Sequence, residues 1–307
     1  MKIAILSYYS GQVDRGVETW AKNLKEKLPN KFDVDILGGD RPALNFFEKF
    51  FYFSLHFFSH IAHIRSADIV IPTNGSIQTF ICRIVTWLLA KPMIVFGHAG
   101  PGADDKWNLL CSPNIFVVFS NSQKKWVEKY KLPWTRVVVI PHAVDTTRFT
   151  PARKKPGKNI ILCVAANIPS KRVNLVEMAV KKLTGYQFIA VGKGNPVEVS
   201  HAEMPVIYQK ADVFCFVPWE REAFGLVFLE ALASNLPVVT IDDDVRREIV
   251  GDSGIFVKNP ENVLEIAGAM KKAREKNWGD EPRRQAEKFG WDKIEKKYEN
   301  LFMNLVQ

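Results

Sequence analysis

Residues 211–240 read ADVFCFVPWEREAFGLVFLEALASNLPVVT, and this stretch decides the fold of the chain. The apolar run Val213 to Val217 predicts a buried strand, which Pro218 and the charged residues after it cannot continue. A helix is expected from about Ala223 to Ser234, and a second strand, Pro237 to Ile241, follows at once. Strand, loop, helix and strand in this order build a parallel sheet. The loop and the helix N-terminus then lie at the carboxyl edge of the sheet, where backbone N–H groups can receive an anion.

Two glutamates frame the predicted helix. Glu222 stands just before it and Glu230 lies further on, about 12 Å along the axis at roughly 1.5 Å per residue. Paired carboxylates of glycoside hydrolases lie roughly 5–9.5 Å apart, so this spacing argues against a hydrolytic acid and base and suits two contacts to one extended ligand. Glu230 also interrupts the apolar run LVFLEALA, where a carboxylate needs a partner. The alternative is that both glutamates are solvated charges of an amphipathic helix.

The segment from Glu222 to Glu230 resembles a known signature. EAFGLVFLE, with LPVV at 236–239, is similar to the Glu-x7-Glu motif of the retaining glycosyltransferases with the two-Rossmann GT-B fold (glycosyl transferases group 1, family 4). In that family the first glutamate and the backbone after it face the donor sugar, and the second glutamate binds the ribose of the sugar nucleotide. The resemblance implies a catalytic role for Glu222 and donor-binding roles for Phe224, Gly225, Leu226 and Glu230.

The resemblance also implies the fold. We expect an α/β protein with two Rossmann-like domains facing across a cleft and a C-terminal helix that crosses back to the N-terminal domain. Residues 1–150 would form the acceptor-side domain, residues 151–288 the sugar-nucleotide-binding domain, and residues 289–307 the crossover helix. The boundary is placed at PARKKPGKN, residues 151–159, because prolines, glycine and cations interrupt the chain there before an apolar strand begins at Ile160.

Two basic residues stand where a helix of the second domain is expected to begin. Lys171 and Arg172 follow the predicted strand Ile160 to Val164 and occupy the first turn of a helix that is predicted to end near Leu183. Cations at a helix N-terminus oppose its dipole, so they need an anion or full solvation. The resemblance implies that both hold the donor pyrophosphate and stabilise the departing nucleoside diphosphate. Where the family often has an additional Gly-Arg, this chain has Ala166-Asn167.

Two glycines and a histidine complete the predicted site. Gly192 closes a predicted strand in a turn that lets a flat base approach the backbone. Gly16 precedes a predicted helix whose first N–H groups can meet an anion, and the family has Gly-Gly where this chain has Arg15-Gly16. His98 follows another predicted strand, and the family has a histidine at a comparable strand end that faces the donor sugar and the acceptor. We expect the catalytic residues to be His98, Glu222, Lys171 and Arg172.

The segment FFEKFFYFSLHFFSHIAHI, residues 46–64, is unusually aromatic. Phenylalanines on both sides of a helix with few charges indicate either a buried helix or a surface that meets lipid or an apolar acceptor. His56, His60 and His63 have a helical spacing that can bind metal, but no carboxylate or cysteine joins them. We predict no metal site, there or at the acidic run Asp242 to Asp244. A loop over the nucleotide and a solvated turn are the alternatives for that run.

The chain is basic, with 42 lysines and arginines against 33 aspartates and glutamates. Such a protein usually meets polyanions: nucleic acid, an anionic membrane or phosphorylated small molecules. Charge that is merely dispersed is the alternative. The apolar run in MKIAILSYYS is too short for a signal peptide, and no stretch reaches about 18 apolar residues, so no transmembrane helix is expected. We predict a cytoplasmic location with peripheral contact at the inner face of the membrane.

These patterns favour a retaining glycosyltransferase that moves a hexose from a UDP-, GDP- or ADP-sugar to a hydroxyl acceptor without a further cofactor. A lipid-linked or membrane-borne glycan is the favoured acceptor. A sugar-nucleotide epimerase or phosphorylase of the same architecture would keep a similar donor site and stays an alternative. A non-enzymatic basic binder of membrane or nucleic acid would explain the charge and the aromatic segment, but it gives no reason for Glu222 and Glu230. We expect no nucleic-acid partner.

Overall fold

The computed structural model describes residues 1–307 except 13–15, 40–44, 154–156, 220–221 and 307. Two compact units make up the chain: residues 1–142 with 294–307 (unit 1), and residues 143–293 (unit 2). The predicted boundary between residues 150 and 151 lies eight residues after this division. Arg15 and the linker residues Lys154 to Pro156 lie outside the described residues.

The described part of unit 1 contains six parallel strands. They are β1 (Lys2–Leu6), β2 (Asp33–Leu37), β3 (Ile69–Pro72), β4 (Ile94–Phe96), β5 (Ile115–Val118) and β6 (Arg136–Val139). The strand orders are β2-β1-β3 and β4-β5-β6, and a bridge between Val70 and Met93 joins β3 to β4. The chain order reverses between β1 and β3. In open α/β sheets ligands bind outside the carboxyl ends of the strands at such a point.

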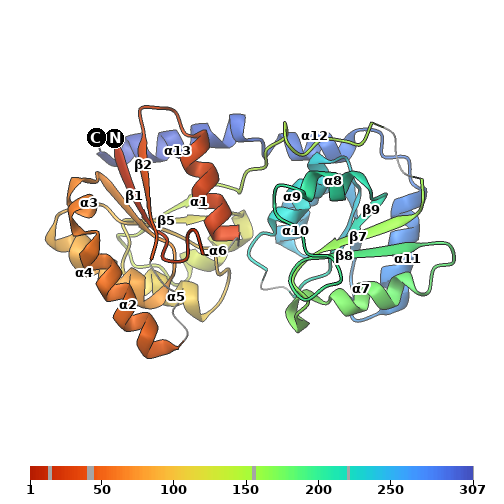
Figure 1. Ribbon diagram of the computed structural model, residues 1–307, viewed down its shortest axis with the longest axis horizontal. Helices are drawn as coiled ribbons and strands as arrows, with labels where there is room; N and C mark the ends of the chain where they lie inside the picture. The colour runs from red at the N-terminus through yellow and green to blue at the C-terminus, as the bar shows by residue number, and fades with distance from the viewer. Residues whose placement is uncertain (13–15, 40–44, 154–156, 220–221, 307) are drawn as a thin grey trace. The chain divides into compact units, whose positions relative to one another are not determined.

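Helices lie on both sides of the unit 1 strands (Figure 1). They are α1 (Gly16–Lys27), α2 (Phe46–Ser59), α3 (Ile61–Ser66), α4 (Ser76–Leu88), α5 (Ala103–Leu110), α6 (Asn121–Glu128) and α13 (Trp291–Val306). The sequence predicts a final helix that returns to the N-terminal domain, and α13 belongs to unit 1 from Ile294 on. The indole Nε1 of Trp20 in α1 donates to the Tyr298 hydroxyl of α13 at 2.9 Å.

The aromatic segment 46–64 forms α2 and most of α3, with a break at His60. Asn45 caps α2, because its side chain accepts from the Glu48 amide at 2.8 Å and the Glu48 side chain accepts from the Asn45 amide at 3.1 Å. Phe53 and Phe57 are buried against the unit, whereas Phe47 is 83% exposed. The segment is therefore buried on one side of α2 and exposed on the other.

Unit 2 is built on a five-stranded parallel sheet. Its strands are β7 (Ile160–Val164), β8 (Gln187–Val191), β9 (Val213–Cys215), β10 (Val238–Ile241) and β11 (Gly254–Val257), in the order β11-β10-β9-β7-β8. The central strands β9 and β10 are buried throughout, which explains why their sequences are unbroken apolar runs. Chain order reverses between β7 and β9, so the loops after these two strands flank the expected ligand position.

Six helices cover the described part of this sheet. They are α7 (Val173–Val180), α8 (Met204–Gln209), α9 (Leu226–Ala233), α10 (Asp244–Val250), α11 (Val263–Glu275) and α12 (Glu281–Glu287). The predicted start of α9 at Ala223 is wrong by three residues, because Gly225 caps the helix with a left-handed φ of +87°. A Cβ at this position would lie 2.8 Å from the Phe228 ring, so only glycine fits.

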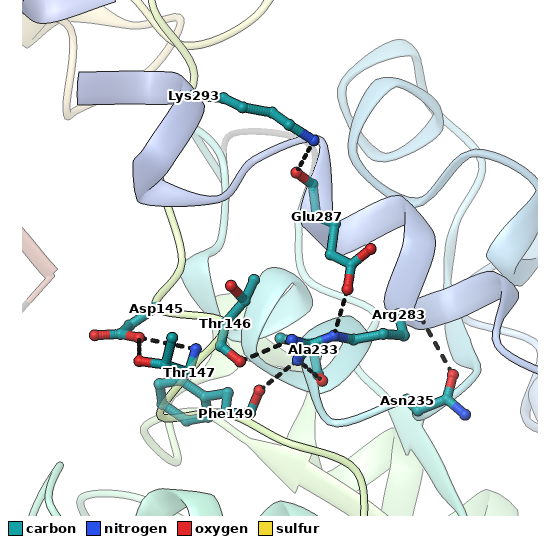
Figure 2. A network of polar contacts seen from close by, with 9 residues as sticks. All are labelled: Asp145, Thr146, Thr147, Phe149, Ala233, Asn235, Arg283, Glu287 and Lys293. Atoms are coloured by element: carbon teal, nitrogen blue, oxygen red, sulfur yellow. Dashed lines mark hydrogen bonds and ion pairs between the residues drawn. The ribbon is translucent and has the colours of Figure 1, made fainter. Parts of the chain in front are cut away.

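Arg283 of α12 ties the start of unit 2 to its core (Figure 2). Its guanidinium donates to the carbonyls of Thr146 at 2.8 Å, Phe149 at 2.7 Å and Ala233 at 2.7 Å. Its Nε also donates to Glu287 Oε1 at 2.9 Å. The planar guanidinium suits this task, because its five N–H groups point outward in fixed directions. One side chain thereby joins residues 146–149, the end of α9 and α12.

Candidate functional site

Lys171 and Glu222 meet at the reversal point of the unit 2 sheet. Lys171 ends the short 3-10 turn η1 (Pro169–Lys171) after β7, and Glu222 lies in the loop after β9. Because β7 and β9 are neighbours, the two loops share one carboxyl edge, and the Lys171 ammonium forms an ion pair with the Glu222 carboxylate. Both side chains keep some exposure, 28% and 18% respectively. A soluble ligand can therefore reach a paired cation and anion here.

Arg172 joins the same two loops. It has a left-handed φ of 50° between η1 and α7, so it caps α7 from the position just before Val173, the first residue of the helix. Its Nη1 donates to the Pro218 carbonyl at 3.0 Å, and its Nη2 lies 2.7 Å from the Glu261 carboxylate. Glu261 is 63% exposed, and such a surface ion pair contributes little stability. An anionic ligand could therefore replace Glu261 as the partner of Arg172 with little loss of stability.

A buried arginine holds the Glu222 loop in place. Arg246 of α10 has no exposed surface, and its Nη1 donates to the Glu222 carbonyl at 2.7 Å. Asp243 accepts from the Arg246 Nε at 3.0 Å and caps α10 by accepting from its amide at 2.8 Å. Asp242 pairs with Arg247 at 2.6 Å. The acidic run thus lies against arginines at a helix start. The sequence analysis missed Arg246, for which the capping pattern of Asp243 was the available signal.

Glu230 is buried in α9 and has two partners. The Tyr208 hydroxyl donates to its Oε2 at 2.7 Å, and His201 Nε2 lies 3.0 Å from its Oε1. Burial and the Glu230 charge raise the pKa of Tyr208 well above its usual value, so this residue remains a donor. The sequence predicts that a carboxylate in this apolar run needs a partner. It does not indicate that the partners are Tyr208 and His201. Both lie around α8, in a stretch where no helix was predicted.

Gly192 and Phe224 line this edge through their backbones. Gly192 has a φ of +124°, and a Cβ there would lie 2.6 Å from the Ala165 carbonyl oxygen. The turn after β8 therefore packs directly on the segment after β7. The Phe224 side chain is buried and packs on Phe289 at a ring distance of 6.3 Å. Beyond it, Gly225 and Leu226 begin α9, whose first N–H groups have no intrahelical partner.

Unit 1 has a cavity of about 540 Å³ at the reversal point of its own strands. Residues that follow β1, β3 and β4 line it, among them Tyr9, Asn74 and His98. Val17 and Glu18 of α1 also line it, and Gly16 is the first residue of that helix. The predicted residues Gly16 and His98 are thus brought to one side of unit 1, at the position where the topology predicts a ligand.

His98 lies among aromatic rings. Its ring centroid is 5.0 Å from that of Trp20, 5.0 Å from that of Phe119 and 5.6 Å from that of His142. Burial lowers the pKa of His98 to about 3, so the imidazole is neutral at physiological pH. Among the described residues, its Nε2 has no hydrogen-bond partner. The His142 ring stacks on the Phe119 ring, with their centroids 3.8 Å apart.

Asp105 and Thr79 add polar groups to the same cavity. Asp105 is fully buried in α5, where burial raises its pKa to about 7 and Asn108 Nδ2 donates to its Oδ1 at 3.4 Å. The other Asp105 oxygen and the Thr79 hydroxyl lack hydrogen-bond partners within the described chain. Neither residue was predicted from the sequence: Asp105 lies in α5, which was not predicted as a helix, and no motif marks Thr79 in α4. The cavity thus offers a neutral histidine, a hydroxyl and a carboxyl group that titrates near neutrality.

The histidines of the aromatic segment lie against backbone. His56 Nε2 is 3.1 Å from the Leu37 carbonyl oxygen and 3.0 Å from that of Gly38, and His60 Nε2 is 3.4 Å from the latter. Across the residues that the structure describes, no three His, Cys, Asp or Glu side chains are arranged to hold a metal ion.

Comparisons with known proteins agree with this geometry. Residues 196–290, all in unit 2, match the family described as Glycosyl transferases group 1. The chain is 25% identical over 213 residues to the MMP alpha-(1->4)-mannosyltransferase of Mycolicibacterium hassiacum, covering 59% of this chain and 52% of that protein. It is 26% identical over 227 residues to a probable sucrose-phosphate synthase of Thermosipho melanesiensis, covering 61% and 53%. The chain therefore spans about half the length of these relatives.

Solved structures share the fold over the whole chain. The sucrose-phosphate synthase of Thermosynechococcus elongatus superimposes with a TM-score of 0.81 at 16% identity, covering 99% of this chain and 98% of that one. HepE of Anabaena, solved with UDP and glucose, gives 0.78 at 14% identity, covering 99% and 100%. The chain is thus an α/β protein of the GT-B fold. Its second unit carries a glycosyl transferases group 1 domain, as the Glu222 to Glu230 signature predicts.

Proposed function

We propose that this chain is a retaining glycosyltransferase that moves a hexose from a nucleotide-diphosphate sugar to a hydroxyl acceptor. The observation that carries the proposal is the Lys171–Glu222 ion pair at the reversal point of unit 2. Glu230 lies in the helix that begins shortly after Glu222. A nucleotide sugar presents two phosphates between two hydroxyl-rich rings. A cation for the phosphates and a carboxylate for each ring match that order of groups.

The ion pair suggests how the donor is accepted. Without ligand, the charges of Lys171 and Glu222 neutralise one another. A diphosphate offers Lys171 more negative charge than one carboxylate does, and Glu222 is then released to accept hydrogen bonds from the sugar hydroxyls. Arg172 would exchange the exposed Glu261 for phosphate in the same way. Ribose hydroxyls would displace His201 from Glu230 and leave Tyr208 to hold the carboxylate.

The expected chemistry is a front-face displacement. The bond between the anomeric carbon and the diphosphate oxygen breaks, and the acceptor oxygen bonds to that carbon on the same face. The acceptor proton passes to the departing phosphate oxygen, so no residue needs to be a covalent nucleophile. Lys171 and Arg172 stabilise the charge that develops on the diphosphate. The neutral His98 suits a hydrogen bond to a sugar hydroxyl and does not add positive charge.

The unit 1 cavity is the proposed acceptor site. Its walls include the aromatic side chains of Tyr9 and Phe53, and Asp105, Asn108 and Thr79 supply hydrogen-bonding groups. Aromatic faces with a few polar groups suit sugar rings, whose C–H faces are apolar and whose edges carry hydroxyls. A lipid-linked or membrane-borne glycan is the favoured acceptor, because α2, which contributes Phe53, also carries exposed phenylalanines.

A donor screen is the first test. A panel of UDP-, GDP- and ADP-sugars should include one that raises the melting temperature, because a ligand that binds only the folded state stabilises it. With that donor, release of nucleoside diphosphate should depend on an added hydroxyl acceptor, and NMR should show the anomeric configuration of the donor in the product. An inverted product would overturn retention.

The same assays separate the alternatives. Conversion of the sugar nucleotide without an acceptor would favour an epimerase, and a requirement for inorganic phosphate would favour a phosphorylase. Steeply salt-dependent DNA binding without any donor-induced stabilisation would favour a non-enzymatic binder.

A further inference from the structure

Three neighbouring helices of unit 1 carry a large apolar outer surface. It consists of exposed side chains from α2, α4 and α5, with two more from the chain just after α6, and we name it the aromatic face. Its members are Phe47, Phe51, Leu55, Phe58, Phe80, Ile84, Trp87, Leu88, Trp107, Leu110, Tyr130 and Trp134. Trp87 is 71% exposed and Leu88 70%. Large contiguous apolar surfaces on a folded protein mark a site of interaction.

The same helices are already packed on their inner sides. Phe57 of α2, Cys82 of α4 and Leu109 of α5 are buried in one core cluster. The 13 residues of α4, SIQTFICRIVTWL, include only one charged residue, Arg83. A surface helix normally turns a polar side outward, but the exposed side of α4 carries Phe80, Ile84, Trp87 and Leu88, so this side needs a second apolar environment. The protein core provides an apolar environment for the inner sides of these helices. Their outer sides need a second one.

Contacts between the helices make the aromatic face continuous. α4 packs against both α2 and α5, and the three helices are neighbours in Figure 1. Lys106 of α5 lies 3.9 Å from the centre of the Tyr130 ring. The Trp134 indole donates to Ser112 at 2.6 Å, which holds it beside the end of α5. The apolar surface therefore runs from α2 across α4 and α5 to Trp134.

Positive charge accompanies this surface. Unit 1 contains 19 lysines and arginines against 13 aspartates and glutamates, and unit 2 contains 23 against 20. Unit 1 thus has two-thirds of the net charge in about half of the chain. Lysines flank the aromatic face on α5, on α6 and in the turn after α6: Lys106, Lys124, Lys125, Lys129 and Lys131. Tryptophan and phenylalanine next to lysine are typical of surfaces that lie in the interface of an anionic bilayer.

We propose that the aromatic face docks unit 1 onto an anionic lipid bilayer. A second copy of the chain is a poorer occupant, because a two-fold contact would bring the lysine-flanked, positively charged surfaces of both copies together. No described helix is long and apolar enough to cross a bilayer, so the helices lie on the membrane with their outer sides in the headgroup region. Docking itself does not depend on the proposed catalysis.

The docking surface and the cavity share their helices. Phe53 of α2, Ile77 of α4 and Asn108 of α5 line the cavity on the inner side of the elements that meet the lipid. If the proposed function holds, a bilayer on the aromatic face brings a lipid-borne glycan next to the acceptor site. The acceptor class would then be a membrane lipid that carries a sugar or polyol headgroup.

Vesicle flotation tests the docking surface directly. The full chain should float with vesicles that contain phosphatidylglycerol and should bind vesicles of phosphatidylcholine alone at least about tenfold more weakly, because the lysines add electrostatic attraction. The double substitution Trp87→Ser and Leu88→Ser should lower binding to the anionic vesicles by about tenfold or more. The matched control, Leu264→Ser with Met178→Ser, changes two exposed apolar side chains of unit 2 and should bind like the unmodified chain.

Three outcomes would overturn the proposal. They are no flotation with either vesicle, equal flotation of the Trp87/Leu88 variant and the unmodified chain, and a concentration-dependent dimer in sedimentation that this variant abolishes. Unchanged melting temperatures would show that the variants fold, since only exposed side chains are altered. Donor-induced stabilisation, measured without vesicles, reports the proposed function separately. Either proposal can therefore fail while the other stands.

Discussion

The two units share parallel strands with one reversal of chain order, yet they differ in the side chains around them. In the described residues, unit 1 exposes 13 large hydrophobic side chains and unit 2 exposes five. At the reversal point of unit 2 stand the ion pairs of Lys171 and Arg172. At the reversal point of unit 1 lies a cavity with the neutral His98. The two units thus have a similar topology but differ in the charge of the side chains at the reversal point.

The reversal points of the two units differ in charge, so each suits a different one of the two proposed substrates. Unit 2 suits an anion, because its cations are held by partners that a diphosphate can replace. Unit 1 suits a neutral polyhydroxy compound, because burial keeps His98 uncharged and raises the pKa of Asp105 to about 7. Substitutions that remove one of these features should affect one unit and spare the other.

The largest effect is expected from Glu222→Ala in unit 2. Loss of this carboxylate removes its contacts to the donor sugar and leaves Lys171 without its partner, so turnover should fall by about 10³-fold or more while the fold is kept. Steady-state kinetics with the identified donor measures this. Glu177→Ala is the matched control, since its ion pair with Lys181 is exposed on α7. Unchanged turnover in Glu222→Ala would refute the assignment.

Arg283→Ala should cause the largest loss of stability in unit 2. The substitution leaves three backbone carbonyls without their donor, and we expect a loss of about 3 kcal/mol in the free energy of unfolding. The neighbouring Arg284→Ala should change stability by less than about 0.5 kcal/mol, because its pair with Asp280 is exposed. Denaturant titration of both variants measures the difference, and equal losses would contradict the role of Arg283.

Asp105→Asn should change the pH dependence of unit 1. The folded-state pKa of Asp105 lies above its unfolded value, so the carboxyl group costs stability as the pH rises from about 4 to about 7. The asparagine variant lacks this cost, and near pH 7 it should be more stable than the unmodified chain by up to about 4 kcal/mol, since each pKa unit is worth about 1.4 kcal/mol. Melting temperatures of both proteins between pH 4 and pH 7 measure this difference in stability, which should become small towards pH 4. A difference in stability that does not change with pH would contradict the raised pKa of Asp105.

The smallest effect is expected from Tyr208→Phe. The variant loses one hydrogen bond to Glu230 but keeps the aromatic ring that packs on Phe149 and Phe214. We expect donor affinity to fall by about tenfold, or about 1.4 kcal/mol, because Glu230 is held less firmly. Isothermal titration with the donor measures this. An unchanged affinity would show that Glu230 needs no support from Tyr208.

Much of the fold could be predicted from the sequence, because most strands are short apolar runs bounded by turn residues. The strand Ile160 to Val164, for example, was predicted with the bounds that the structure gives. Helices α5 and α8 were missed. Both are short, and α5 begins ADDKW with three charged residues in a row, so neither shows a clear apolar period.

The candidate site was predicted where a local motif marks it. The segment from Glu222 to Glu230 identifies the donor-side loop and helix within thirty residues of sequence. The residues that hold this segment come from elsewhere in the chain, and their contacts depend on the fold: Arg246 on Glu222, and Tyr208 on Glu230. The cavity of unit 1 depends on three strand ends and four helices, and no sequence pattern brings these together.

The Lys171–Glu222 pair has a consequence for selectivity. An anion that binds Lys171 but offers nothing to Glu222 leaves a carboxylate without its counter-ion, which weakens binding of that anion. Inorganic phosphate, nucleic acid and free nucleotides are anions of this kind. A sugar nucleotide avoids the penalty, because its hydroxyl groups hydrogen-bond to the freed carboxylate. The ion pair would therefore weaken the binding of phosphate compounds that carry no sugar for Glu222. It would do so without any group that repels them directly.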